Sequence, residues 1–174
     1  KGTYAIYHED GLDYNELKVY MNEKGDLVGY PKAKEITLDE FWALSVDILI
    51  PSALENAVTA DVANKIQAKL VCEAANGPLT PEADEILEQK GITVTPDILT
   101  NAGGVTVSYF EWVQNLYGYY WGEDEVQEKE EIAMVNAFKA IWEIKEEYNV
   151  TVRKAAYMHS VKKVAEVMKL RGWY

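Results

Sequence analysis

The chain has 174 residues, of which 48% are hydrophobic, and its 17 Lys and Arg against 29 Asp and Glu give a formal charge of -12. A net-negative chain without a cluster of Lys and Arg has no positively charged surface to neutralise a phosphate backbone, so we expect no nucleic-acid partner. No uninterrupted apolar stretch approaches the ~18 residues of a membrane span, and the first residues do not follow a signal-peptide pattern. We therefore expect a cytoplasmic protein that does not enter a membrane.

The cysteine and histidine content bounds the chemistry further. Cys72 is the only cysteine, which excludes an internal disulfide, and two isolated histidines, His8 and His159, do not supply the clustered ligands of a metal site. We therefore expect no bound metal. The chain opens on Lys1 rather than on Met and enters an apolar run at Tyr4–Tyr7 almost at once, so we expect it to be part of a longer protein.

The N-terminal part of the chain contains three predicted elements. The apolar run Tyr4–Tyr7 favours a strand, and the mixed pattern of Asp13–Met21 favours a helix. A second helix is predicted to begin after Thr37, because Glu40 lies three residues further on and the two side chains together complete a capping box.

From Val46 onward the sequence repeats one order of signals: a short apolar run, a turn of small residues, then a helix. The predicted strands are Val46–Ile50, Leu70–Glu73 and Ile92–Val94. The predicted helices are a segment from about Thr59 to Gln67, one that begins after the cap Thr80 with Pro81 in its first position, and one that follows a turn at Thr100–Gly104 and runs through Leu116. Alternating strands and helices imply parallel strands joined by right-handed crossovers, so the predicted class is α/β.

Strand signals end near Glu123, and two helices are predicted to fill the rest of the chain. The first, from Glu123 to about Asn149, opens with acidic residues that suit the positive end of a helix dipole and carries a broad apolar stripe. The second begins at Thr151 and ends at Gly172. We therefore expect an α/β core followed by a C-terminal helical segment that packs on it.

Ligands of an open parallel sheet bind outside the carboxyl ends of its strands. The turns predicted there, Pro51–Ala53, Ala74–Gly77 and Asn101–Gly104, are built from small residues that let a flat cofactor approach the backbone. Asn76 and Asn101 each carry a carboxamide, which both donates and accepts and so suits a ribose hydroxyl or a nicotinamide amide. The alternative is that both residues only stabilise their turns, because Asn tolerates a left-handed backbone.

Ser108 is a candidate for binding an anion. The glycines Gly103 and Gly104 place it in or just after the first turn of a helix, where free backbone N–H groups and the helix dipole favour a carboxylate. The alternative is that its hydroxyl bonds a carbonyl of its own helix. The sequence contains no G-x-G-x-x-G motif and no evident acid–base constellation.

Several longer strings are more specific than any single turn. They are Val46–Asn56, Cys72–Pro78, Pro96–Asn115 and Leu170–Tyr174. Together they resemble hexameric glutamate dehydrogenases of bacteria and archaea, within the superfamily of glutamate, leucine, phenylalanine and valine dehydrogenases. The resemblance runs essentially from end to end.

The resemblance implies a Rossmann-like parallel sheet, truncated at its N-terminal side, and a C-terminal helical segment. Residues 1–122 would be the distal part of a dinucleotide-binding domain, and residues 123–174 would be helices that pack on it and toward a substrate domain. That substrate domain with the catalytic residues, and the first strand with its Gly-rich turn, would lie outside this chain. We therefore expect the 174 residues alone to be inactive, and to self-associate or be marginally stable through exposed apolar surface.

The resemblance also assigns site residues. Ser52 and Ala53 would line the adenosine side of a cofactor cleft, Asn76 would meet the nicotinamide ribose, and Asn101 would hold the nicotinamide end. Val105 and Ser108 would face the substrate side chain, with Ser108 donating to a distal carboxylate; these site residues are Ser52, Ala53, Asn76, Asn101, Val105 and Ser108.

The activity implied for the complete protein is the reversible oxidative deamination of L-glutamate to 2-oxoglutarate and ammonia by a homo-hexamer. NAD is the expected cofactor, with NADP left open, because the ribose-holding residue would lie outside the chain. Ser108 favours glutamate, since an apolar substrate would leave its buried hydroxyl unpaired. Two alternatives stay open: a non-catalytic nucleotide-binding or assembly module, and a leucine or phenylalanine dehydrogenase.

Overall fold

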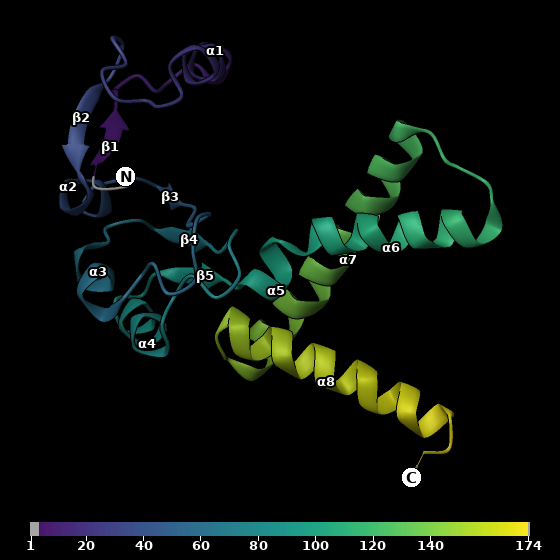
Figure 1. The fold of residues 1–174 in the computed structure, drawn as a ribbon. Helices are drawn as coiled ribbons and strands as arrows, with labels where there is room; N and C mark the ends of the chain where they lie inside the picture. Colours follow the sequence, from purple (N-terminus) through teal and green to yellow (C-terminus); the bar gives the residue numbers. More distant parts are fainter. Residues whose placement is uncertain (1–3, 174) are drawn as a thin grey trace. The chain divides into compact units, whose positions relative to one another are not determined.

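The computed structural model describes residues 4–173. Lys1, where the expected cofactor-domain segment begins, and Tyr174, where the last family-like string ends, lie outside the described residues. The chain divides into two compact units. The N-terminal unit comprises residues 1–45 and 65–67, and the C-terminal unit comprises residues 46–64 and 68–174 (Figure 1). The boundary expected at residue 122 between a cofactor domain and C-terminal helices stays a prediction.

The N-terminal unit is built on a two-stranded antiparallel sheet. Strand β1 (Tyr4–Tyr7) pairs with β2 (Lys34–Thr37), and the helices are α1 (Tyr14–Lys24) and α2 (Leu38–Trp42). The strand predicted at Tyr4–Tyr7 and the helix predicted at Asp13–Met21 are confirmed, with α1 beginning one residue later and ending three residues later than expected. Strand β2 was not predicted, because its four residues contain a single apolar side chain, the buried Ile36.

The capping box predicted at Thr37 is confirmed. The Thr37 side chain accepts a hydrogen bond from the Glu40 backbone N–H at 3.1 Å, and the Glu40 carboxylate accepts one from the Thr37 backbone N–H at 2.7 Å. Each residue thus satisfies a donor that the start of α2 would otherwise leave free.

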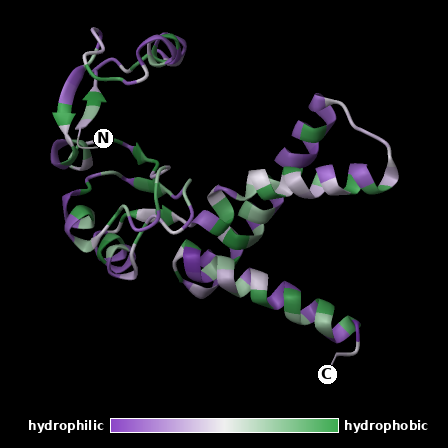
Figure 2. Cartoon of the chain, in the orientation of Figure 1, coloured by the Kyte–Doolittle hydropathy of each residue, from purple (hydrophilic) through white to green (hydrophobic). Residues whose placement is uncertain are grey.

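The C-terminal unit contains a three-stranded parallel sheet in the order β3-β4-β5. The strands are β3 (Ile48–Leu49), β4 (Leu70–Cys72) and β5 (Thr93–Thr95), with α3 (Ala60–Lys65) and α4 (Pro81–Gln89) between them. The predicted α/β class is confirmed, although β3 and β4 are shorter than the predicted strands and β5 lies one residue later than predicted. In Figure 2, β3 and β4 carry hydrophobic colours, while α3 and α4 alternate hydrophobic and hydrophilic residues as amphipathic helices do.

Local capping and apolar burial explain this arrangement. Thr80 accepts a hydrogen bond from the Ala83 backbone N–H, and Pro81 occupies the first turn of α4, as predicted. Fully buried side chains come from β4, from both helices and from the segment before α3. They are Val58, Ala63, Val71, Ala83 and Leu87.

The turn predicted at Thr100–Gly104 is wrong over most of its length. Helix α5 (Asp97–Thr100) already contains Thr100, and α6 (Ala102–Tyr117) already contains both glycines. Only Asn101 separates the two helices, and its φ of -99° and ψ of 9° lie close to helical values. The chain therefore kinks rather than turns, and both glycines are tolerated because they lie in the first turn of α6.

The two long C-terminal helices are α7 (Glu123–Tyr148) and α8 (Val152–Leu170), as predicted. Asn149 takes a left-handed conformation at the end of α7, and the Thr151 side chain caps α8. A buried apolar cluster joins α5, α7 and α8 and fixes the helices to the C-terminal unit (Figure 1). Its members are Leu99, Ile141, Val152, Ala155 and Ala156. Within residues 4–173, no helix has both the length and the apolar character needed to cross a membrane.

Candidate functional site

The carboxyl edge of the parallel sheet is formed by three loops that hydrogen bonds hold together. The Pro51 carbonyl, after β3, accepts from the backbone N–H groups of Ala74 at 3.0 Å and Ala75 at 2.9 Å, after β4. The Gly77 backbone N–H donates to Oδ2 of Asp97, after β5, at 2.8 Å. Because each loop is tied to a neighbour, the loops present their side chains from one fixed surface.

The two asparagine candidates meet at this edge. Nδ2 of Asn101 donates to Oδ1 of Asn76 at 2.7 Å and to the Ala74 carbonyl at 3.3 Å. Asn76 is exposed and Asn101 is half-buried. Among residues 4–173, the Asn76 amide N–H₂ group and Oδ1 of Asn101 have no partner. The pair therefore offers a ligand one donor group and one acceptor side by side.

Ser52 and Ala53 lie in the exposed loop after β3. The Ser52 hydroxyl donates to the Ile50 carbonyl at 2.9 Å, within its own loop. In the part of the chain that the structure describes, no hydrogen bond joins either side chain to the asparagine pair. The loop is fixed to the site through Pro51, but the role predicted for these two residues stays a prediction.

Val105 and Ser108 are exposed on α6. Helix α6 begins at Ala102, and Ser108 lies in its second turn, so the first-turn amides do not surround it. Its hydroxyl donates to the Gly104 carbonyl at 2.9 Å, which is the alternative that the sequence left open. A carboxylate would have to rotate this hydroxyl away from Gly104 before accepting from it.

Beneath the loops lies a network centred on Arg153, near the start of α8. Its guanidinium donates to Glu73 at 2.7 and 3.1 Å and to Asp84 at 2.7 and 3.2 Å. A third carboxylate, that of Asp97, lies 3.9 Å from the guanidinium. Oε2 of Glu73 also accepts from the Asp97 backbone N–H at 2.7 Å. The network joins the ends of β4 and β5 to α4 and α8.

Burial makes this network costly to disturb. The Glu73 side chain is 1% exposed, so its charge is compensated by protein groups rather than by water. Burial acts to lower the pKa of Arg153, but the hydrogen bonds that the guanidinium donates to Asp84 and Glu73 outweigh it and raise the pKa above its usual range. Removing one partner would leave an uncompensated buried charge.

Sequence reasoning did not identify these residues as a group. Glu73 carried a signal, because an acidic residue that directly continues an apolar strand needs a partner when the strand is buried. Its partner Arg153 lies 80 positions away, on α8. Neither periodicity nor motif spacing links residues so far apart.

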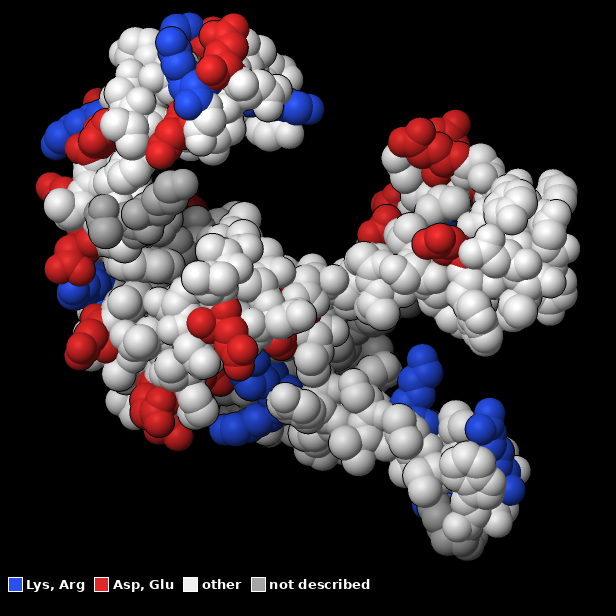
Figure 3. All heavy atoms as spheres, viewed as in Figure 1, with Lys and Arg blue, Asp and Glu red and all other residues white. Residues whose placement is uncertain are grey.

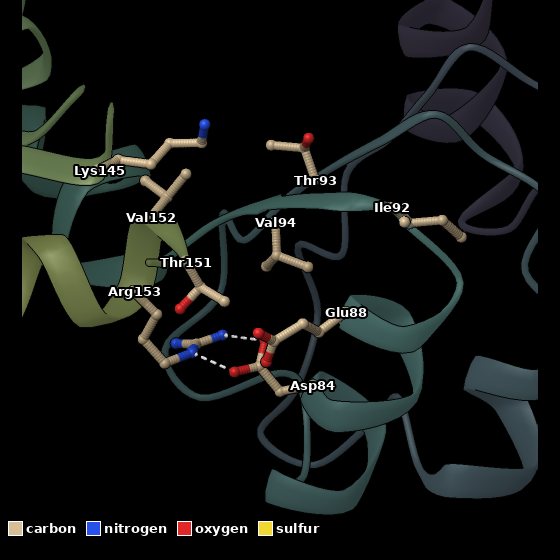
Figure 4. A pocket seen from close by; sticks show the side chains of 10 residues that line it. Asp84, Glu88, Ile92, Thr93, Val94, Lys145, Thr151, Val152 and Arg153 are labelled. Carbon is tan, nitrogen blue, oxygen red and sulfur yellow. Dashed lines mark hydrogen bonds and ion pairs between the residues drawn. The ribbon is translucent and has the colours of Figure 1, made fainter. Parts of the chain in front are cut away.

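A cavity of about 150 Å³ lies on the other side of Arg153, between α4, β5 and the α7–α8 junction (Figure 4). Figure 4 shows the guanidinium of Arg153 directed at the carboxylate of Asp84, while Val94 and Val152 supply apolar walls. Asp84 pairs with Arg153 at its rim, while Glu88 and Lys145 pair with residues outside the lining, so the cavity offers a ligand few free charges.

Charges gather at the ends of the long helices. Figure 3 shows Asp and Glu over the beginning of α7 and Lys and Arg along α8 toward the C-terminus. The surface of α6 and the loop after it is nearly free of charge in this view and carries exposed aromatic rings. They are Tyr109, Trp112, Tyr117, Tyr119 and Tyr120. Over residues 4–173, no cluster of three His, Cys, Asp or Glu side chains could hold a metal ion.

These features define a class: an α/β protein whose parallel sheet presents polar loops at its carboxyl edge, where such folds bind ligands. Comparisons with known proteins specify it further. The family model described as Glutamate/Leucine/Phenylalanine/Valine dehydrogenase matches residues 2–172. A protein of Clostridioides difficile named NAD-specific glutamate dehydrogenase is 71% identical over 174 residues, which are 100% of this chain and 41% of that protein.

Solved structures agree. A crystal structure of glutamate dehydrogenase from Peptoniphilus asaccharolyticus matches with a TM-score of 0.80 and 49% identity, over 97% of this chain and 37% of that one. A hetero-hexameric glutamate dehydrogenase from Thermus thermophilus matches with a TM-score of 0.87 and 33% identity, over 97% of this chain and 39% of that one. The chain belongs to the Glutamate/Leucine/Phenylalanine/Valine dehydrogenase family. It spans about 41% of the length of the curated relative from Clostridioides difficile.

Proposed function

We propose that the full-length protein is an NAD-dependent glutamate dehydrogenase. The reaction converts L-glutamate, NAD⁺ and water into 2-oxoglutarate, ammonium, NADH and one proton. The observation that carries the proposal is the 71% identity to a protein named NAD-specific glutamate dehydrogenase, which extends over all 174 residues and thus over every loop of the candidate site.

In this proposal the loops of the C-terminal unit hold the cofactor. The fit rests on the chemistry of the asparagine pair, whose free N–H₂ on Asn76 suits a ribose oxygen and whose free carbonyl on Asn101 suits the nicotinamide amide. Ser52 and Ala53 would line the adenosine side, where their small side chains let the cofactor approach the backbone. When bound, the nicotinamide ring accepts a hydride from the α-carbon of the substrate.

Val105 and Ser108 are proposed to contact the substrate side chain from α6. A carboxylate would attract the Ser108 hydroxyl because a charge-assisted hydrogen bond is about twice as strong as the neutral one that it now makes to Gly104. An apolar side chain could not recruit the hydroxyl in this way. Glutamate is therefore the proposed substrate rather than leucine or phenylalanine.

The proposal also covers the assembly of the full-length protein. One structural relative is titled as a hetero-hexamer, and we propose a hexamer here, built from a single kind of chain and located in the cytoplasm. Residues 1–122 would form part of the cofactor domain, and residues 123–174 would be helices that pack on it and toward a substrate domain.

The test is a substrate and cofactor comparison on the purified full-length protein. NADH formation is followed by absorbance with glutamate, leucine or phenylalanine as substrate, and each assay is repeated with NADP. We expect the highest kcat/KM for glutamate with NAD. Higher turnover of leucine or phenylalanine would assign one of those activities instead, and NAD binding without any turnover would indicate a non-catalytic binding module.

A further inference from the structure

A continuous chain of hydrogen bonds leads from α8 to the asparagine pair. Arg153 holds the Glu73 carboxylate at 2.7 and 3.1 Å, and Oε2 of Glu73 accepts from the Asp97 backbone N–H at 2.7 Å. The Asp97 carboxylate in turn accepts from the Gly77 backbone N–H at 2.8 Å. Gly77 directly follows Asn76, so the chain ends in the loop that carries this asparagine.

The same chain fixes the second asparagine. Asp97 is the first residue of α5, and its backbone carbonyl accepts from the Asn101 backbone N–H at 3.0 Å. Asp97 is therefore bonded both to the loop of Asn76 and to the residue that bonds the Asn76 side chain. A shift of Asp97 would change the distance between the two asparagines.

We propose that Arg153 is a positioning residue for the cofactor site, acting through Glu73 and Asp97 on the spacing of Asn76 and Asn101. That Asn76 and Asn101 bind a cofactor rests on the proposed function. The control of their spacing by Arg153 does not depend on it.

The chemistry of the guanidinium explains why arginine performs this task. Its planar fork bonds both oxygens of Glu73 at once and so fixes the rotation of that carboxylate as well as its place. The orientation of the carboxylate decides whether Oε2 faces the Asp97 backbone N–H. A lysine would keep the positive charge but bind as a single point, leaving the carboxylate free to turn.

The network has a second arm that provides a control. Arg153 also bonds Asp84, which lies on α4. Among residues 4–173, no hydrogen bonds lead from the Asp84 carboxylate to either asparagine except through Arg153, so this arm ties α8 to α4 only. If Arg153 only attached α8 to the rest of the unit, losing its bonds to Asp84 would have the same effect as losing its bonds to Glu73.

Lys154 supplies a further control. It follows Arg153 on α8 and lies 3.9 Å from Glu88 on α4, with both side chains more than half exposed. Its ion pair links the same two helices without touching Glu73. Exposed pairs of this kind contribute little to stability.

The experiment compares four variants of the full-length protein: Arg153→Lys, Asp97→Asn, Asp84→Asn and Lys154→Met. NAD binding is measured by isothermal titration calorimetry, and hydrogen exchange of the segment 74–80 is measured by mass spectrometry. The Gly77 amide, which donates to Asp97, lies in that segment and reports on the chain directly.

We expect Arg153→Lys and Asp97→Asn to speed exchange of the segment 74–80 and to raise the Kd for NAD about tenfold, because one oriented hydrogen bond to a charged group is lost. Lys154→Met should leave both quantities within roughly twofold of the parent values. Asp84→Asn keeps both bonds between Arg153 and Glu73, so it should speed exchange of the segment 74–80 less than Arg153→Lys does. Asp97→Asn replaces the charged acceptor of the Gly77 bond by a weaker neutral one and changes no residue of α8, so it keeps the test valid if Arg153→Lys folds poorly.

Two results would overturn the inference. The first is equal acceleration of exchange in Arg153→Lys and Asp84→Asn, which would make Arg153 a fastener of α8 only. The second is faster exchange in Arg153→Lys with NAD affinity unchanged. If the parent protein binds no NAD, the proposed function fails, and the comparison of exchange between Arg153→Lys and Asp84→Asn decides the positioning role by itself.

Discussion

The side-chain amide of Asn101 donates a 2.7 Å hydrogen bond to the side-chain carbonyl of Asn76, 25 residues earlier in the chain. The two residues follow neighbouring parallel strands, β4 and β5. Each asparagine therefore fixes the rotamer of the other, and the free amide of one and the free carbonyl of the other face a ligand in a fixed relation. This arrangement reduces the side-chain entropy that binding would otherwise cost.

The first prediction concerns Asn101→Ala in the full-length protein. The change removes the bond to Asn76 and frees its side chain, so we expect the KM for NAD to rise about tenfold, with a smaller effect on the KM for glutamate. Steady-state kinetics measure both constants. Asn115→Ala is the control, because Asn115 is an exposed asparagine on α6 that only accepts from the Tyr120 hydroxyl. Similar constants for the two variants would remove Asn101 from the cofactor site.

The second prediction concerns Ser108→Ala. The exposed hydroxyl contributes little to stability, because it only bonds back to the Gly104 carbonyl. We expect the KM for glutamate to rise about tenfold, the loss of one hydrogen bond to a charged group, and the KM for NAD to change far less.

Thr106→Val is the matched control for Ser108→Ala, since the Thr106 hydroxyl makes the same kind of bond, to the Ala102 carbonyl at 2.8 Å. It should leave the KM for glutamate near the parent value. Equal increases in the two KM values of Ser108→Ala would contradict a contact with the substrate.

The third prediction concerns Gly104→Ala and Gly103→Ala. A Cβ on Gly104 would meet no atom within 4 Å, so alanine should stabilise the helix, by about 0.5 kcal/mol near its end. A Cβ on Gly103 would clash with Oε1 of Glu130, so that carboxylate would have to move and the gain should be smaller or absent. Urea denaturation ranks the two variants, and a lower midpoint for Gly104→Ala than for Gly103→Ala would contradict the helical geometry.

The fourth prediction concerns the pH dependence of Glu40. Hydrogen bonds from the Thr37 backbone N–H and from the Thr37 hydroxyl hold the pKa of this carboxylate below its usual 4.5. Because the folded-state pKa is the lower one, the stabilisation is present above pH 4.5 and is lost as the pH falls through the folded-state value. A carbon-13 NMR titration of the Glu40 carboxyl group measures the shift directly.

Thr37→Val removes the hydroxyl and should move the pKa of Glu40 back toward its usual value. Glu40→Gln should remove this contribution to the acid sensitivity of the melting temperature. A Glu40 titration at or above 4.5 in the parent protein would show that the capping box does not persist in solution.

Elements whose signals lie within a few residues were predictable from the sequence. The caps at Thr37, Thr80 and Thr151 each bond a backbone amide three residues further on, and the helices begin where these caps indicate. The alternation of strands and helices likewise predicted the parallel sheet. Family membership followed from long strings at the sheet edge, and the comparison with known proteins confirms it.

Predictions failed where the local sequence pattern was weak or where tertiary contacts favoured a different structure. Strand β2 has one apolar residue, and it exists because β1 pairs with it. The two glycines after Asn101 indicated a turn, yet they continue as helix because α5 and α6 nearly join. The helix propensity of a glycine is only about 1 kcal/mol less favourable than that of alanine, which tertiary packing can override.

By itself, the sequence determined the α/β class, the starts of the helices capped by threonine and the two asparagines that follow neighbouring strands. Only the tertiary structure decided that Asn101 bonds Asn76 and that Arg153 bonds Glu73, 80 positions earlier. The physical reason is the range of the interactions. A cap or an apolar repeat acts between residues close in sequence, whereas a buried ion pair forms only after the chain has folded and brought distant charges to a site without water.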